Sequence, residues 1–319
     1  MNELRPVLFK DIIGQNQLKE KLKIVIDSAK KRDKAMPHIL IQGSQGNGKT
    51  TLSIATANEI GRPIIVAAGS NFKTLKDVAS YVYQIAEHGK DGKCILYIDE
   101  VHKVKEFEIL YHLVEDFIFK ANEEYIFNVP EFTLICSTNQ VSKLPLPFYN
   151  RLQIKCVLSE YTMDEIAQIV GISAKKYGFT LTDKQAHDIA LASKVNPRTA
   201  NGHVTFIRDY VTTQNLSKLN DRHMKDIFRL MEVDDRGLDR NDLKYLEIVK
   251  DLGPVGVTTI SHMMQVDRQT VEYSIEPYLL SIGLVKKTGQ GRILVGSKDK
   301  IEELLSQLYA TLTPEEVKK

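Results

Sequence analysis

Four short runs of apolar residues occur in the first half of the chain, and segments with helical periodicity separate them. The runs begin at Ile39, Ile64, Cys94 and Phe132. Each run is nearly all apolar, as strands buried on both faces are, and helical connections between such strands favour a parallel sheet. We therefore predict an α/β domain in which helices cover both faces of a parallel sheet and ligands bind at the carboxyl ends of the strands.

The segments around these runs supply the other predicted elements. One helix ends at Gly61, a second covers residues 75–85, and a third covers residues 106–117. Residues 144–150 include two prolines and are expected to form a rigid loop, which precedes a strand beginning at Ile154.

Strand signals stop near residue 159, and helical patterns follow. Four helices are predicted at residues 163–177, 183–193, 198–213 and 221–230. After a short linker, D-D-R-G, three more are predicted at residues 241–252, 258–264 and 268–282. A hairpin with central glycines comes next, and three helices followed by a hairpin are the layout of a winged helix. We therefore predict three domains, at residues 1–159, 160–231 and 232–319.

The composition is that of a folded protein, with 43% hydrophobic and 26% charged residues, which excludes collagen-like, low-complexity and disordered chains. No apolar run approaches the roughly 20 residues that a membrane helix needs, and the start M-N-E-L-R-P lacks a secretory pattern. We therefore expect a cytoplasmic protein without a membrane partner. Cys94, Cys136 and Cys156 lie in apolar stretches without zinc-ligand spacing, so buried reduced thiols are expected.

The charge balance is nearly even. The chain carries 43 basic and 41 acidic residues, and the predicted last domain carries 12 basic and 15 acidic residues. This balance neither requires nor excludes nucleic acid, so a DNA-binding surface would be a local basic patch.

The strongest chemical signal is G-S-Q-G-N-G-K-T at residues 43–50, which matches G-x-x-x-x-G-K-S/T and lies between a predicted strand and a predicted helix. Its glycines, including Gly46 and Gly48, let backbone N–H groups turn toward phosphates, and the helix N-terminus adds partial positive charge. Lys49 is expected to reach the β- and γ-phosphates of ATP, and the Thr50 hydroxyl to bind Mg²⁺. The alternative is an ordinary glycine-rich turn.

Polar residues also end the third and fourth apolar runs. Asp99 at the end of a buried strand is costly to desolvate unless a cation compensates, and Mg²⁺ beside Thr50 would do so. Glu100 is placed to polarise the attacking water, and Asn139 could orient the same water. The alternatives are a salt-bridged acidic pair and, for Asn139, a turn residue.

Nearly the whole chain, from about Leu4 to Val295, resembles the AAA+ ATPases and, within them, the RuvB family of Holliday junction branch-migration helicases. The motifs that carry the resemblance include L-R-P and I-I-G-Q within residues 4–15, I-D-E-V-H at 98–102 and V-N-P-R-T-A-N at 195–201. Residues 253–260 and 270–292 resemble the C-terminal domain of that family, which most AAA+ proteins lack. The resemblance implies an AAA+ P-loop domain, a small helical lid and a C-terminal winged helix.

The resemblance also implies nucleotide contacts outside the phosphate loop. Leu4 and Arg5 would border the adenine, and Tyr161 and Arg198 would close the lid over the nucleotide. The other positions that align with nucleotide-contacting positions of the family are Thr51, Glu115, Asp116 and Phe117.

Two further roles depend on the resemblance alone, because an isolated arginine is usually a solvated surface group. Arg151 would be the arginine finger, which reaches the ATP of a neighbouring subunit. Lys287 and Arg292, on the wing, match basic residues that contact DNA in the family. For the wing, the alternative is a solvated hairpin with ordinary surface charges.

Several positions depart from the family pattern. Ser44 and Gln45 replace two prolines, the first sensor is S-T-N-Q instead of A-T-T-R, and Tyr149 and Gln290 each replace an arginine. The departures are typical of a divergent homologue, such as one encoded by a phage or a mobile element.

The most telling departure is the hairpin between Phe117 and Phe132, which is longer in the family and docks the partner RuvA. Its tip here carries Asn122, Glu123 and Glu124, with Ala121 and Tyr125 as the apolar residues. Burying two unpaired carboxylates opposes docking, so we expect no standard RuvA binding through this hairpin.

We therefore expect an ATP-hydrolysing DNA motor of RuvB type, which assembles as a hexameric ring and drives branch migration in recombination and repair. A finger supplied in trans requires a neighbouring subunit. Two alternatives stay open: a clamp-loader-like or initiator ATPase that loads a partner on DNA, and a slow ATP-dependent DNA-binding switch. The predicted winged helix and the G-P-V-G stretch argue against the first.

Overall fold

The computed structural model describes residues 3–89, 93–120 and 126–312. It divides into two compact units, Met1–Tyr161 and Thr162–Lys319. Within the described residues, no helix is both long and apolar enough to cross a membrane.

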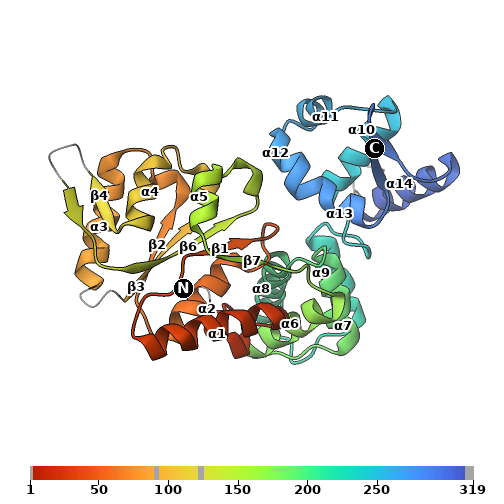
Figure 1. Ribbon diagram of the computed structural model, residues 1–319. Helices are drawn as coiled ribbons and strands as arrows, with labels where there is room; N and C mark the ends of the chain where they lie inside the picture. The colour runs from red at the N-terminus through yellow and green to blue at the C-terminus, as the bar shows by residue number, and fades with distance from the viewer. Residues whose placement is uncertain (1–2, 90–92, 121–125, 313–319) are drawn as a thin grey trace. The chain divides into compact units, whose positions relative to one another are not determined.

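The first unit contains a five-stranded parallel sheet, as predicted (Figure 1). Its strands, in spatial order, are β2 (Ile64–Ala68), β3 (Cys94–Asp99), β6 (Phe132–Thr138), β1 (Ile39–Gln42) and β7 (Ile154–Val157). The register pairs Leu96 with Leu134 and Ile39 with Ile135. Because β1 lies between β6 and β7, the loop that follows β1 meets the carboxyl ends of both neighbours.

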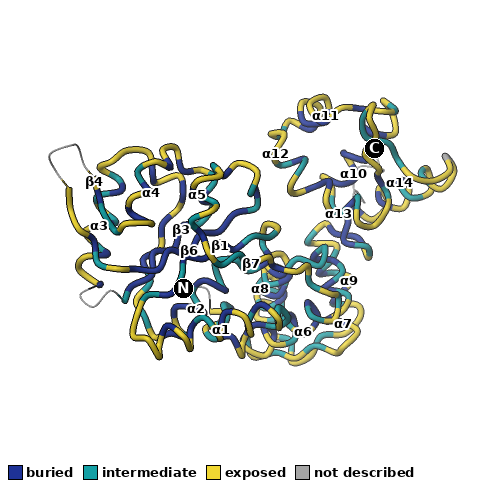
Figure 2. Tube along the Cα trace, in the orientation of Figure 1, coloured by how far each residue is buried: buried dark blue, intermediate teal, exposed yellow. Residues whose placement is uncertain are grey.

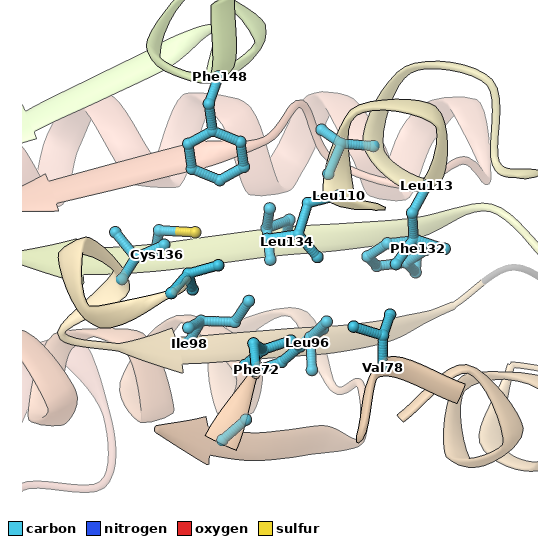
Figure 3. Packing of buried hydrophobic residues seen from close by; sticks show 14 of the residues in the cluster. Phe72, Val78, Leu96, Ile98, Leu110, Leu113, Phe132, Leu134, Cys136 and Phe148 are labelled. Atoms are coloured by element: carbon cyan, nitrogen blue, oxygen red, sulfur yellow. The ribbon is translucent and has the colours of Figure 1, made fainter. Parts of the chain in front are cut away.

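Alternate residues of the strands pack on opposite faces of this sheet. On one face, α1 (Asn16–Arg32) and α2 (Lys49–Ile60) cover side chains such as Ile39, Ile95 and Ile135. On the other face, α3 (Leu75–His88), α4 (Glu108–Glu115) and α5 (Leu146–Arg151) enclose the cluster drawn in Figure 3. The central strands are buried along most of their length (Figure 2), which explains their uniformly apolar sequences.

Local sequence sets the helix ends. The Thr74 side chain accepts a hydrogen bond from the Asp77 amide and begins α3 with a capping box. Gly61, with φ of 76°, ends α2 in the left-handed conformation, as predicted for that helix. Short 3₁₀ turns complete the unit at Phe9–Asp11, Gly69–Asn71, Val101–Lys103 and Val141–Lys143.

A small antiparallel hairpin of β4 (Ile118–Lys120) and β5 (Ile126–Asn128) follows α4. Phe119 is buried, whereas Ile126 and Phe127 are 52% and 49% exposed. Residues 121–125, which form the tip of the hairpin in the prediction about RuvA docking, lie outside the described residues.

The second unit begins with a group of helices, in agreement with the predicted lid. These are α6 (Met163–Lys176), α7 (Asp183–Ala192), α8 (Pro197–Thr213) and α9 (Asp221–Leu230). Ile166, Val170, Ile189 and Val204 are wholly buried among them.

A winged helix completes the second unit. Its elements are α10 (Arg240–Leu252), α11 (Val257–Met264), α12 (Arg268–Thr270), α13 (Glu276–Ser281), the wing strands β8 (Val285–Thr288) and β9 (Gly291–Leu294), and α14 (Lys298–Leu312). Leu305, Leu308 and Leu312 of α14 join the same core as Leu246 and Ile260.

One predicted element was wrong, and one predicted helix is confirmed with a local irregularity. Residues 146–151 form the short helix α5 rather than a loop, because Pro147 occupies its first turn, where a missing N–H is tolerated. The helix predicted at residues 268–282 is interrupted by a π-helical stretch, Val271–Ile275. Pro277 cannot donate to the carbonyl of Tyr273, and the wider turn before it accommodates that loss.

The three cysteines are free and buried, as expected. Burial raises the pKa of Cys94 and that of Cys156 to about 11. They are therefore neutral core thiols at ordinary pH.

Candidate functional site

The phosphate loop closes directly onto the sheet. The Gly43 amide donates to the carbonyl of Thr138 at 3.3 Å, and a Cβ on Gly43 would come within 2.9 Å of Leu158. Gly46 and Gly48 have φ of 85° and 90°, which side-chain-bearing residues rarely adopt. Gly48 is also the N-cap of α2, so the loop delivers the amides of the first helical turn to the carboxyl edge of the sheet.

Lys49 lies over this loop. Its Nζ donates to the carbonyl oxygens of Gly43 and Ser44, both at 2.9 Å. Phosphate oxygens in the loop would offer the same ammonium charged acceptors, which make stronger hydrogen bonds than neutral carbonyls do.

Thr50 and Asp99 come together at the start of α2 and the end of β3. The Thr50 hydroxyl donates to Asp99 Oδ2 at 3.3 Å, and Ser137 Oγ donates to Asp99 Oδ1 at 2.5 Å. The Tyr97 hydroxyl lies 3.1 Å from Thr50 Oγ1 and 2.9 Å from Ser137 Oγ. Burial, and then the nearby Asp99 charge, raise the pKa of Tyr97 above its ordinary value, so this hydroxyl stays protonated.

This arrangement fits Mg²⁺ bound together with a nucleotide. A hydroxyl and a carboxylate are the hard oxygen ligands that Mg²⁺ prefers, and Mg²⁺ takes its remaining ligands from waters and phosphates. In the described part of the chain, no group of three or more His, Cys, Asp or Glu side chains could hold a metal by itself. The site therefore suits a metal that arrives with phosphates.

Glu100 is held beside this pair by an unusual backbone. Its φ of 48° is left-handed, and its carbonyl approaches Gly69 so closely that a Cβ there would lie 2.3 Å away. The carboxylate forms an ion pair with Lys103 and is 39% exposed. It is thus accessible to water at the edge of the site.

Asn139 follows β6 at the same edge. Its Oδ1 is buried and has no hydrogen-bond partner among the described residues. Buried polar atoms normally have a partner, so this oxygen is suited to a ligand or to water. Nearby, Thr138 Oγ1 contacts His102 Nδ1 at 2.9 Å, and burial lowers the pKa of His102.

Glu160 also belongs to the site, although the sequence did not single it out. It accepts hydrogen bonds from Ser44 Oγ at 2.7 Å and from Asn47 Nδ2 at 3.1 Å. The hydroxyl of Tyr161, the next residue, would be 3.7 Å from a Cβ on Gly48. The long separation of Glu160 from the loop in sequence left no pattern that could have revealed this contact.

The N-terminal segment is fixed to the same region. The Gln15 side chain exchanges two hydrogen bonds with the backbone of Ser159, at 2.8 and 3.0 Å. Leu4 is buried and Arg5 and Thr51 are half-buried within the first unit. Arg198 is exposed at the start of α8 in the second unit, where the Asn196 side chain caps the helix.

Arg151 is held by side chains of its own chain. Its guanidinium binds Glu115 Oε2 through Nε at 2.8 Å and Nη2 at 2.5 Å, and it lies over the Tyr111 ring at 4.8 Å. It remains 27% exposed. Glu115 therefore contacts the predicted finger.

The two residues after Glu115 have other partners. Asp116 Oδ2 lies 3.1 Å from His112 Nδ1. Phe117 packs edge-on against Phe132, with ring centroids 5.7 Å apart.

The predicted DNA contacts on the wing surround a buried carboxylate. Glu276 is wholly buried and binds Lys287 Nζ at 2.8 Å and Arg292 Nε at 2.7 Å. Tyr245 donates to the same carboxylate at 3.0 Å. Burial would raise the pKa of Glu276, but the hydrogen bonds from Arg292 and Lys287 lower it. Lys287 is 48% exposed and Arg292 only 15%, so the two are not equivalent surface cations.

Comparison with known proteins gives consistent matches along the chain. Three family models match: the Holliday junction DNA helicase RuvB P-loop domain over residues 4–158, the RuvB AAA lid domain over 161–234 and the RuvB C-terminal winged helix domain over 235–297. The chain is 35% identical to the Holliday junction branch migration complex subunit RuvB of Campylobacter hominis, with 93% of this chain and 89% of the relative covered.

Two further matches agree. The subunit of the same name from Limosilactobacillus reuteri is 32% identical, with 91% of this chain and 88% of the relative covered. Among solved structures, the Thermotoga maritima RuvB Holliday junction branch migration motor matches with a TM-score of 0.83 at 29% identity, covering 95% of this chain and 98% of that one.

Proposed function

The chain belongs to the RuvB family of AAA+ ATPases, and from this premise we propose that it is an ATP-driven motor that moves DNA through Holliday junctions by branch migration. The observation that carries the proposal is the meeting of a complete phosphate loop with the Thr50–Asp99 pair at the carboxyl edge of the sheet. A motor of this family needs such a site to draw work from ATP.

We assign the chemistry to residues of this edge. Lys49 and the loop amides, with Gly46, Gly48 and Thr51, would bind the phosphates. Thr50 and Asp99 would hold Mg²⁺, which when bound neutralises charge on the phosphate oxygens. Glu100 would polarise the attacking water and Asn139 would orient it.

We propose the same three domains that the sequence predicted, at residues 1–159, 160–231 and 232–319. Leu4 and Arg5 would border the adenine, and Tyr161 and Arg198 would bring the lid onto the nucleotide. Closing a lid over a bound substrate shields the reaction from water and completes the catalytic site.

Hydrolysis is proposed to need a neighbouring subunit in a hexameric ring. Arg151 would stabilise the charge that develops on the neighbour's phosphates, a role that arginine fingers supply in trans. In support, Glu115 and Tyr111 hold the guanidinium, and the Arg151 side chain is still 27% exposed. We propose that this subunit interface is flanked by Glu115, Asp116 and Phe117. In this proposal these residues do not contact the nucleotide bound in their own subunit.

We propose that the protein acts in the cytoplasm. We also propose that it binds DNA through the phosphates and not through the base sequence. The exposed Lys287 on the wing is the residue best placed to contact them. Arg292 would support it by neutralising Glu276.

Docking of a standard RuvA through the β4–β5 hairpin is not expected, and this stays a prediction. Ile126 and Phe127 are exposed apolar residues beside the tip, so the expectation depends on the carboxylates of Glu123 and Glu124. A pull-down with RuvA tests it, and tight binding that Phe127→Ala abolishes would contradict it.

The proposed function predicts ATPase activity that four-way junction DNA stimulates. A clamp-loader-like or initiator ATPase would instead respond to its protein partner, and a slow switch would bind DNA with little turnover. Steady-state hydrolysis with four-way junctions, linear duplex and no DNA therefore separates the three. Equal hydrolysis under all three conditions would count against a DNA motor.

A further inference from the structure

Two buried hydroxyls lie under the Thr50–Asp99 pair without a role in the scheme above. Tyr97 is on β3, and Ser137 is on the neighbouring strand β6; both are wholly buried. The Tyr97 ring belongs to the apolar cluster beneath α1 and α2. A hydroxyl in such surroundings is costly unless it is hydrogen-bonded, so its partners indicate what it does.

The four side chains form a closed ring of contacts. Tyr97 Oη lies 3.1 Å from Thr50 Oγ1 and 2.9 Å from Ser137 Oγ. Ser137 Oγ and Thr50 Oγ1 in turn donate to the two oxygens of Asp99, at 2.5 and 3.3 Å. Each proposed magnesium ligand is therefore held by one of the two hydroxyls, Thr50 by Tyr97 and Asp99 by Ser137, and the two hydroxyls contact each other.

The number of available protons determines which group donates each hydrogen bond in this ring. Each hydroxyl has one proton, and an ionised carboxylate only accepts. The protons of Ser137 and Thr50 go to Asp99, so Tyr97 is the donor toward the other two hydroxyls and shares its proton between them. Thr50 Oγ1 then has one lone pair facing Tyr97 and one left for a cation.

The hydrogen bonds that the Asp99 carboxylate accepts also fix its orientation. Asp99 Oδ1 accepts from Ser137 Oγ and also from the Glu100 amide at 3.0 Å. Oδ2 accepts only the longer contact from Thr50 among the hydrogen bonds described. Oδ1 is thus the more firmly held oxygen of Asp99, and Oδ2, which has only the longer contact, is better placed to bind the metal or its water.

We propose that Tyr97 and Ser137 are positioning residues that fix the rotamers of Thr50 and Asp99 for Mg²⁺ binding. The proposal rests on the proposed function, because it assumes that Mg²⁺ binds here with a nucleotide. Neither hydroxyl touches the nucleotide or the metal in this scheme. Ser137 stands where the family motif A-T-T-R has alanine, which has no hydroxyl to donate.

The test compares nucleotide binding with and without the metal. Tyr97→Phe and Ser137→Ala each remove one hydroxyl and keep the phosphate loop. Affinity for a fluorescent ATP analogue is titrated in EDTA and over a range of Mg²⁺ concentrations. We expect the affinity in EDTA to stay within about twofold of wild type, and the Mg²⁺ concentration for half-maximal enhancement to rise about 10-fold, the low end for loss of a group that orients metal ligands.

Two controls separate orientation from loss of packing. Tyr81→Phe removes a hydroxyl that contacts Asn71 in the same unit and should leave the Mg²⁺ requirement unchanged. The double variant Tyr97→Phe/Ser137→Ala should show less than the product of the two single effects, because the hydroxyls act through one ring. Independent, multiplying effects would contradict a shared ring.

The outcomes are distinguishable. If wild type responds to Mg²⁺ and both single variants need the same Mg²⁺ concentration for half-maximal enhancement, the positioning role is wrong, but the proposed function stands. A wild-type protein that binds the analogue without any response to Mg²⁺ would overturn the proposed function as well. If Tyr97→Phe does not fold, as judged by thermal unfolding without nucleotide, Ser137→Ala decides the matter by the same measurement.

Discussion

Lys49 and Glu100 lie in one site but would act on different parts of a bound nucleotide. Lys49 donates into the phosphate loop, whereas Glu100 is at the water-exposed edge. Lys49→Ala should abolish nucleotide binding, because the phosphates lose their main cation. Glu100→Gln keeps the loop, so ATP should bind while hydrolysis falls at least about 100-fold, the loss expected for a general base.

Equilibrium binding and single-turnover hydrolysis check both variants. A Glu100→Gln protein that binds no ATP would show that Glu100 does not serve mainly to activate water.

The two wing cations are expected to respond differently to substitution. Lys287→Ala should lower the slope of log affinity for DNA against log salt by about 1, the contribution of one phosphate contact. Arg292→Ala removes the more buried of the two cations that bind Glu276 and should mainly destabilise the protein, by about 3 kcal/mol, as breaking a buried ion pair does.

Salt titrations of DNA binding and chemical denaturation distinguish the two effects. Lys286→Ala is the matched control, since Lys286 is exposed on the same strand and alternates to the other side of the hairpin. A change in slope with Lys286→Ala, but not with Lys287→Ala, would place DNA on that other side.

Within helix α8, His203 is expected to make the protein less stable in acid. Burial, and then the nearby Lys194 charge, lower the pKa of His203 to about 4. An unfolded histidine has a pKa of about 6.5, so the unfolded state binds more protons between these values and stability falls as the pH drops through that window. At pH 5 the loss is about 2 kcal/mol.

Denaturant unfolding at pH 7 and pH 5 measures this effect. His203→Gln cannot titrate and should lose about 2 kcal/mol less stability than wild type between the two values. The same loss in both proteins would assign the acid sensitivity to other groups.

The elements that the sequence predicted well are those with strong local signals. The buried strands and the helix ending at Gly61 follow from apolar runs and a glycine stop. Helices α1 and α14 were not predicted, although Leu18, Leu22 and Ile26 and then Leu305, Leu308 and Leu312 have helical spacing. Both helices therefore have a local sequence signal, the helical spacing of their buried leucines and isoleucines.

The residues of the candidate site also divide into those that have a local sequence signal and those that do not. Residues of the phosphate loop and the strand ends could be found because they are contiguous in sequence. The contacts of Glu160 with Ser44, of Glu115 with Arg151 and of Glu276 with the wing join distant segments and depend on the folded chain. No local pattern could have predicted them.

At the scale of the whole molecule, hydrolysis should require two subunits. Arg151→Ala should bind ATP normally but hydrolyse it about 10³-fold more slowly, the low end for an arginine finger. Mixing Arg151→Ala with Lys49→Ala subunits should restore some hydrolysis, because some interfaces then pair an intact loop with an intact finger. No recovery at any ratio, in rings shown to be mixed, would contradict action in trans.

The protein is proposed to convert ATP hydrolysis into movement of a DNA junction. The most direct test of this proposal is the dissociation of a labelled four-way junction with homologous arms, followed on gels with wild-type protein and with Glu100→Gln. We expect ATP-dependent release of duplex products by wild type, and junction binding without release by Glu100→Gln. Release that continues at the wild-type rate with Glu100→Gln, or with no ATP, would contradict an ATP-driven motor.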